Sequence, residues 1–215
     1  MTAGSRQVVL ERIRAGLAEI DGEMQTGYAE LPRLYNQRGS MSVEAKLALM
    51  VERLREYDAE VVECPEAALE ATIAAQIAGS GRRVLAAPAG LPKQWLAGGV
   101  DWRVDHDLSH EQIEEAEGVV TASFCGVADS GTIVLHHSPA EGRRVLTLLP
   151  DWHLCVLRAS QVVETLPEYF ARCTEPPRLA TYISGPSATA DIEMTRIKGV
   201  HGPRFLSVVL VQDDV

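Results

Sequence analysis

The chain has 215 residues, of which 46% are hydrophobic, so it is long enough to bury a full core, and we expect one main domain. Its formal net charge is −10, which argues against a nucleic-acid-binding surface or a polybasic membrane patch. No segment approaches the ~20 apolar residues that span a bilayer, and the first residues do not resemble a signal peptide. We therefore expect a cytoplasmic protein without a membrane span.

The first half of the sequence alternates helical and strand-like segments. A strand–helix–strand order of this kind indicates a parallel sheet covered by helices. In chain order, the expected elements are a helix over 5–20, an irregular arm over 21–41, a helix capped by Ser42, a strand over 60–63, a helix from Pro65 to Ile77 and a strand over 84–87.

The second half is richer in β-type runs. After a loop that holds Trp95 and Trp102, the expected elements are a helix with a Ser109/Gln112 capping box, a hairpin of strands over 119–127 and 132–136, a strand over 154–157, a helix from Ser160 that Pro167 splits, and strands over 179–183 and 205–211. The class is α/β, with a mixed, largely parallel sheet and helices on both faces. We divide the chain into residues 1–41, a helix and an arm, and residues 42–215, the α/β domain.

The segment from Ser184 to Asp191 is the most informative one. It begins where an apolar run stops, Gly185 allows a close approach, and a helix-compatible stretch follows. The free N–H groups of a helix start bind anions readily. Neither Ser187 nor Thr189 has Glu or Gln three residues later, so no capping box engages their hydroxyls. We predict that these residues bind a small anion, with plain helix capping as the alternative.

His201 follows this segment and is bracketed by Gly199, Gly202 and Pro203. The glycines let the backbone bend sharply and present the imidazole, whose near-neutral pKa suits proton transfer or stabilisation of an oxyanion. We predict that His201 is catalytic and that Gly202 lines the same pocket as Ser187. A turn histidine without a chemical role is the alternative.

A second candidate is the turn from Asp129 to Thr132. Asp-x-Gly is ordinary hairpin chemistry, but Asp129 at a strand end is also a candidate nucleophile or base, with Thr132 beside the ligand. Arg143 and Arg144 follow, and one of them could reach a substrate carboxylate, although paired arginines are more often solvated.

Metals and common cofactors lack support in the sequence. The four cysteines form no C-x-x-C pair, and Cys125 and Cys155 lie in apolar runs typical of buried thiols in a reducing compartment. His106 and His110 have the spacing of a helical metal pair, but the helix begins after His106, so we predict no metal site. No dinucleotide fingerprint, P-loop or nucleophile elbow occurs, and no cofactor is evident.

Over residues 42–212 the chain resembles the LUD-domain family, in particular its lactate utilization protein C type. The matching motifs are Gly118–Thr121, Ala128–Leu135, Leu148–His153, Ser184–Glu193 and Gly199–Pro203. The resemblance implies the fold shared by ribose-5-phosphate isomerase, glucosamine-6-phosphate deaminase and the CoA-transferases. It also implies a cytosolic role in oxidising L-lactate to pyruvate, beside partner proteins that carry iron–sulfur clusters.

One departure from the family is Asp129, which stands where the family has Glu in an Ala-Glu-Thr-Gly-Thr turn. Its carboxylate is about one methylene (~1.5 Å) short, which disfavours a covalent transfer role by analogy with CoA-transferases. Our first interpretation is therefore a component of a lactate utilization system that binds a small anion. The alternatives are a non-redox enzyme that uses Asp129 and His201, and a regulatory or assembly subunit. The sequence leaves open whether the chain is itself catalytic and whether it forms a homo-oligomer.

Overall fold

The computed structural model describes residues 3–18, 31–189, 197–198 and 201–213. The chain divides into two compact units, Met1–Asn36 and Gln37–Val215. In the smaller unit, α1 (Ala3–Ala18) confirms the helix expected near the amino terminus, and the described part of the expected arm has no regular structure. In the larger unit, the backbone N–H of Gly39 donates to Glu168 Oε1 at 3.0 Å. Among the described residues, no helix is long and apolar enough to cross a membrane.

The larger unit is built on a six-stranded sheet in the order β1-β12-β7-β4-β2-β3, in which every pair of neighbours is parallel. Its strands are β1 (Glu60–Pro65), β2 (Val84–Pro88), β3 (Asp101–Asp105), β4 (Gly118–Thr121), β7 (Trp152–Arg158) and β12 (Phe205–Gln212). The expected final strand is thus internal, between β1 and β7. This arrangement confirms the α/β class.

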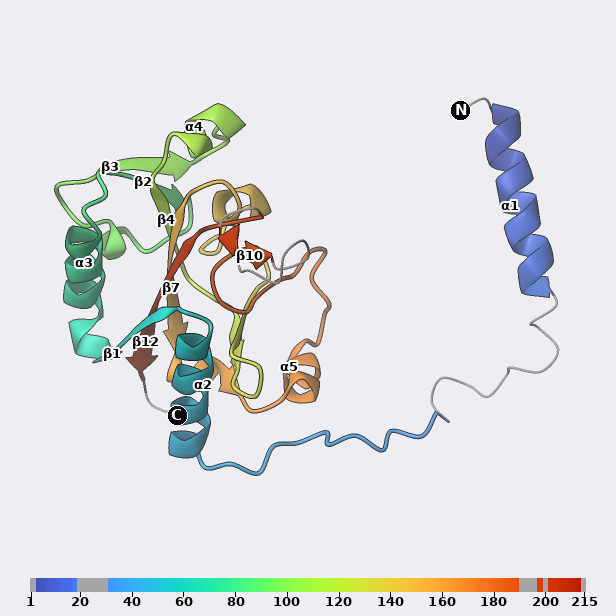
Figure 1. Cartoon of the computed structure of the whole chain (residues 1–215), viewed down its shortest axis with the longest axis horizontal. Helices are drawn as coiled ribbons and strands as arrows, with labels where there is room; N and C mark the ends of the chain where they lie inside the picture. The colour runs from blue at the N-terminus through green and yellow to red at the C-terminus, as the bar shows by residue number, and fades with distance from the viewer. Residues whose placement is uncertain (1–2, 19–30, 190–196, 199–200, 214–215) are drawn as a thin grey trace. The chain divides into compact units, whose positions relative to one another are not determined.

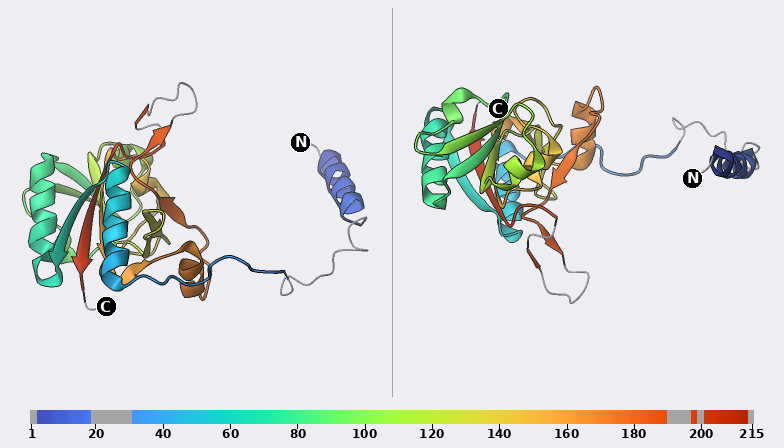
Figure 2. Two further views of the ribbon diagram at one scale, coloured as in Figure 1. Left: turned by 60° about the horizontal axis from the view of Figure 1, so that its bottom comes forward. Right: turned by 90° about the horizontal axis from the view of Figure 1, so that it is seen from above.

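Helices cover both faces of this sheet (Figures 1 and 2). The helix α2 (Val43–Glu56) begins at the predicted cap, where Ser42 Oγ accepts from the N–H of Ala45 at 3.2 Å, and packs on one face through Met50 and Leu54. The helix α3 (Leu69–Ser80) packs on the opposite face. Alternate residues of the buried strands supply the two cores, as parallel strands covered on both faces require.

A second sheet of four strands packs beside α2, in the order β8-β5-β6-β9. Its strands are β5 (Cys125–Val127), β6 (Thr132–Leu135), β8 (Val162–Val163) and β9 (Thr181–Ile183). The hairpin turn expected at 129–131 joins β5 to β6, which pair antiparallel. The single strand expected over 119–127 was wrong, because the chain leaves the first sheet after Thr121 and enters the second at Cys125.

Three other expectations need correction. The helix expected from Ser160 begins later, as α5 (Leu166–Arg172), because Val162 and Val163 pair with β5. Trp102 lies in the edge strand β3 rather than in a loop. Pro65 ends β1 and precedes a short 3₁₀ turn, instead of opening the helix. The capping box at Ser109 is present and starts α4 (His110–Glu114), as expected.

The helix expected after Ser187 was also wrong. Ala188–Thr189 forms β10, which pairs antiparallel with β11 (Ile197–Lys198) in a two-stranded ribbon. No helix N-terminus therefore presents free N–H groups at Ser187. The predicted site residue Asp191 lies outside the described residues.

Candidate functional site

A cavity of ≈ 230 Å³ lies where the base of the β10–β11 ribbon meets the amino ends of β7 and β12 and the carboxyl end of β9. Ligands of open α/β sheets usually bind at the carboxyl ends of the strands. The position of this cavity at the amino ends of β7 and β12 therefore differs from what sheet topology alone predicts. The lining residues are Arg144, Thr147, His153, Thr181, Tyr182, Ile183, Ser184, Gly185, Pro186, Ser187, His201, Gly202, Pro203 and Leu206.

Five of the residues predicted from the sequence line this one cavity. They come from the two sides of the ribbon base, although 14 residues of sequence separate Ser187 from His201. The five residues are Ser184, Gly185, Ser187, His201 and Gly202. Of the other predicted binding residues, Thr132 lies in β6 and is not among the lining residues, and Thr189 lies in the backbone of β10. Their roles in ligand binding stay predictions.

Ser187 closes the base of the ribbon. Its backbone N–H donates to the carbonyl of Pro203 at 2.8 Å, and its Oγ accepts from the backbone N–H of His201 at 3.0 Å. The hydroxyl hydrogen of Ser187 is not used in either bond, so it can be donated to a ligand. The hydroxyl of Ser187 is therefore positioned at the cavity by hydrogen bonds at the base of the β10–β11 ribbon, and not by the start of a helix.

The backbone conformation and the neighbours of Gly185 require a glycine at this position. Its φ is 83°, and a Cβ built on it would lie 2.4 Å from Tyr57 Cβ and 3.0 Å from the Tyr57 carbonyl oxygen, at the end of α2. Only glycine avoids both the left-handed strain and the clash. Gly185 thus permits a close approach of Tyr57, and the close approach of a ligand that the sequence predicted there stays a prediction.

Neither Thr132 nor Asp129 lines the cavity. Thr132 is buried, and its Oγ1 lies 2.8 Å from Ser184 Oγ and 2.8 Å from Ser130 Oγ. Asp129 is exposed in the hairpin turn, where its N–H donates to the Glu164 carbonyl at 3.0 Å. Asp129 does not belong to the cavity lining.

Arg144 is the charged residue of the cavity. It precedes β7 in a 3₁₀ turn (Arg144–Thr147), and its Nη1 donates to both the carbonyl oxygen and the Oγ1 of Thr147 at 3.1 Å. Burial lowers the pKa of Arg144, yet no carboxylate lies within ion-pair distance among the described residues. Its neighbour Arg143, by contrast, is paired with Asp105 through Nε at 2.8 Å and Nη2 at 2.6 Å.

His153 adds a neutral polar group to the same cavity. It is 1% exposed, and its Nε2 lies 2.7 Å from the Oγ1 of Thr121. Burial, together with the positive charge of Arg144, lowers its pKa to about 3, so the imidazole is uncharged near neutral pH. The sequence suggested only a structural role for His153, since a histidine that opens a strand gives no sign of which residues it will face.

The lining therefore combines hydroxyl donors with one cation that has no ion-pair partner among the described residues. It contains Arg144, two histidines and four hydroxyl-bearing residues besides a tyrosine, and none of the described lining residues is Asp or Glu. A desolvated cation is costly unless it is paired, so this cavity is complementary to a small anion. The sequence offers Arg143 and Arg144 as alternative partners of a substrate carboxylate. In the structure Arg144 lines the cavity, whereas Arg143 is paired with Asp105.

Comparison with known proteins places this architecture in a family. The model of the LUD domain matches residues 37–211. The chain belongs to the LUD-domain family. This confirms the resemblance found in the sequence.

Two relatives of the LUD-domain chain carry the same name. "Lactate utilization protein C" of Deinococcus radiodurans is 41% identical over 164 residues, which cover 74% of this chain and 76% of the relative. The protein of that name from Bacillus subtilis is 36% identical over 134 residues, or 57% of this chain and 55% of the relative. The crystal structure of a DUF162 family protein from Deinococcus radiodurans has a TM-score of 0.69 at 35% identity, and the match covers 80% of this chain and 99% of that one.

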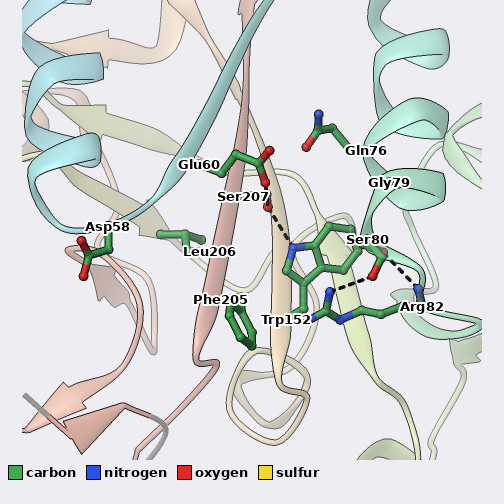
Figure 3. A pocket seen from close by; sticks show the side chains of 10 residues that line it. All are labelled: Asp58, Glu60, Gln76, Gly79, Ser80, Arg82, Trp152, Phe205, Leu206 and Ser207. Atoms are coloured by element: carbon green, nitrogen blue, oxygen red, sulfur yellow. Dashed lines mark hydrogen bonds between the residues drawn. The ribbon is translucent and has the colours of Figure 1, made fainter.

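The LUD domain has a second cavity, of ≈ 340 Å³, at the amino ends of β1 and β12 on the side of α3 (Figure 3). Its lining includes the carboxylates of Asp58 and Glu60. Its cation, Arg82, lies over the ring of Trp152 with Cζ 5.0 Å from the centroid, and its Nη2 is 3.9 Å from a carboxylate oxygen of Asp151. Arg82 thus has a carboxylate partner in the protein, whereas Arg144 has none within the described ranges.

Proposed function

We propose that this chain is a cytosolic component of an L-lactate utilization system and that it binds a small carboxylate in the cavity at Arg144. The names of the relatives support the first part, and iron–sulfur partner proteins would carry the electrons. The four cysteines are all free thiols, which fits a reducing compartment.

The observation that carries the proposal is the charge of Arg144, for which the described part of the chain supplies no carboxylate partner. Thr147 holds the guanidinium from one side, which leaves its remaining N–H groups for a ligand. A guanidinium recognises a carboxylate through paired hydrogen bonds, and the desolvated site strengthens them. The volume of ≈ 230 Å³ suits a molecule of a few heavy atoms, such as lactate or pyruvate.

His201 and Ser187 would complete the binding site. The Ser187 hydroxyl can donate to the bound anion, and His201 lies at the exposed side of the cavity, where it can exchange protons with solvent. The alternative of a phosphosugar isomerase or CoA-transferase needs Asp129 beside the ligand. Asp129 does not line the cavity, so no observation favours that alternative.

Isothermal titration of the purified full chain tests the proposal, with L-lactate, pyruvate, acetate, inorganic phosphate, a phosphosugar and a CoA ester as probes. Arg144→Gln should weaken carboxylate binding by about 10- to 100-fold, the worth of a hydrogen bond to a charged group. Arg143→Gln is the matched control, because Arg143 is adjacent in sequence but engaged with Asp105, and it should bind as the wild type does. Equal affinity of wild type and Arg144→Gln would contradict the proposal.

A further inference from the structure

His137 sits in a strained position directly behind the cavity. It follows β6 by two residues, is half-buried, and has a φ of 58°, which is uncommon for a residue other than glycine. Its Nδ1 lies 2.8 Å from the carbonyl oxygen of Gly142, and its Nε2 lies 2.8 Å from the Oγ1 of Thr181. Backbone strain of this kind persists only where the surroundings hold it, here through both ring nitrogens.

The two bonds fix where the hydrogen atoms are. A carbonyl oxygen only accepts, so Nδ1 of His137 must carry a hydrogen that it donates to Gly142. In the neutral imidazole the other nitrogen, Nε2, is then an acceptor, and the hydrogen it accepts is the only one on the Thr181 hydroxyl. The carbonyl of Gly142 therefore sets, through His137, the direction in which the Thr181 hydroxyl points its hydrogen.

Thr181 also lines the cavity. It opens β9, is only 8% exposed, and lines the same space as Arg144. Within the described chain, Nε2 of His137 is the one hydrogen-bond partner of its Oγ1. With a neutral His137 imidazole, the Thr181 hydrogen is donated to Nε2, and the Thr181 hydroxyl oxygen then offers only lone pairs to a ligand. Ser187, in contrast, keeps a hydrogen that can turn toward a ligand.

We propose that Thr181, oriented by His137, accepts a hydrogen bond from the ligand, and that the cavity thereby selects a 2-hydroxy acid over the corresponding 2-oxo acid. This inference rests on the proposed function, in which Arg144 holds the carboxylate. The hydroxyl of a 2-hydroxy acid lies on the carbon next to the carboxylate and can donate to Oγ1 of Thr181. The carbonyl oxygen of a 2-oxo acid has no hydrogen, and its lone pairs would face those of Thr181. A site built around an oriented acceptor discriminates in this way, because the wrong ligand leaves a buried polar atom unpaired.

Isothermal titration with L-lactate, pyruvate and propionate at about pH 8 tests the inference on the full chain. Lactate and pyruvate have the same carboxylate and nearly the same size, so the ratio of their dissociation constants reports the 2-position alone. The wild type should bind L-lactate about three- to tenfold more tightly than pyruvate, the worth of one hydrogen bond. Propionate, which lacks the oxygen, should also bind more weakly than lactate.

Three variants and a control separate the role of the hydroxyl from folding. Thr181→Val should bring the lactate-to-pyruvate ratio to within about twofold of one, and Thr181→Ser should retain the preference. His137→Asn tolerates a positive φ but no longer fixes the Thr181 hydrogen, and it should also reduce the preference. Thr174→Val removes an exposed threonine hydroxyl outside the cavity and should leave the ratio unchanged.

The outcomes distinguish this inference from the function on which it rests. If none of the carboxylates binds, or if binding is unaffected in Arg144→Gln, both fail. If they bind through Arg144 but the wild-type ratio is close to one, or if folded Thr181→Val retains the lactate preference, the selection by Thr181 is wrong and the anion site stands. Should Thr181→Val not fold, His137→Asn decides, and an undiminished lactate preference in that variant overturns the inference.

Discussion

The Oγ1 of Thr132 lies 2.8 Å from the Oγ of Ser184, and this hydrogen bond joins the β5–β6 hairpin to the rim of the cavity across 52 residues of sequence. Ser130 extends the row of hydroxyls back to the turn that holds Asp129. Of the two residues that the sequence singled out in the hairpin, Thr132 is thus bonded to a residue that lines the cavity. We expect Thr132 to act on ligand affinity through the position of Ser184.

A double-mutant cycle on Thr132→Val and Ser184→Ala measures that support. The two substitutions break the same hydrogen bond, so their effects on the free energy of unfolding should fall short of the sum by about 0.5–1.5 kcal/mol. Urea denaturation of the four proteins gives the value. Additive effects would mean that the two hydroxyls do not stabilise one another.

The isolated chain should not oxidise L-lactate by itself. The sequence has neither a dinucleotide fingerprint nor a cysteine set for a cluster, so in the proposed function the electron carriers would be on partners. Purified chain mixed with L-lactate and an artificial electron acceptor should show no lactate-dependent reduction. Its absorption spectrum should lack flavin and iron–sulfur bands. Sustained turnover by the chain alone would disprove this expectation.

The sequence predicted the helices and strands well where the signals are local. The apolar runs of β7 and β12, the cap at Ser42 and the capping box at Ser109 depend on neighbouring residues, so periodicity and capping rules find them. The edge strand β3 alternates charged and apolar residues, and only its pairing with β2 makes it a strand. Such pairing depends on tertiary structure, so the β-propensities of the residues do not predict it.

The candidate site shows the same division. Gly185 and Gly202 mark backbone breaks in the sequence itself, so the segments that form the cavity could be predicted. The sequence could propose Arg144 as a carboxylate-binding residue only together with Arg143. No local pattern tells which of the two arginines pairs with Asp105. Thr181 was missed altogether, since its importance comes from a bond to His137, 44 residues away.

Gly185→Ala should be far more damaging than Gly202→Ala. A methyl at Gly185 would clash with Tyr57 at 2.4 Å, whereas one at Gly202, despite a φ of 150°, would meet Ser187 Cβ at an ordinary 3.5 Å. We expect a loss in the free energy of unfolding of more than about 2 kcal/mol for Gly185→Ala and of about 1 kcal/mol for Gly202→Ala. Thermal or urea unfolding of the two variants shows which one loses more stability. A larger loss for Gly202→Ala would contradict the close contact between Gly185 and Tyr57.

His153 should make the stability of the protein depend on pH. In the folded state burial lowers its pKa to about 3, while an unfolded histidine titrates near ~6.5. Below about pH 6.5 the unfolded state therefore binds a proton that the folded state does not, so stability falls as the pH is lowered from there toward 3. The loss has a slope of up to about 1.4 kcal/mol per pH unit, and above pH 6.5 this residue contributes none.

His153→Gln isolates this effect, because glutamine can still hydrogen-bond Thr121 but does not titrate. Burial also lowers the pKa of His136, and that contribution remains in both proteins, so the difference between their unfolding free energies across pH 5–7 belongs to His153. The difference should shrink as the pH falls. If the variant does not fold, a nuclear magnetic resonance titration of the wild type answers the same question, since the His153 imidazole signals should not move between about pH 5 and 8. A midpoint near 6.5 would mean that the imidazole is solvated and that Arg144 does not stand beside it.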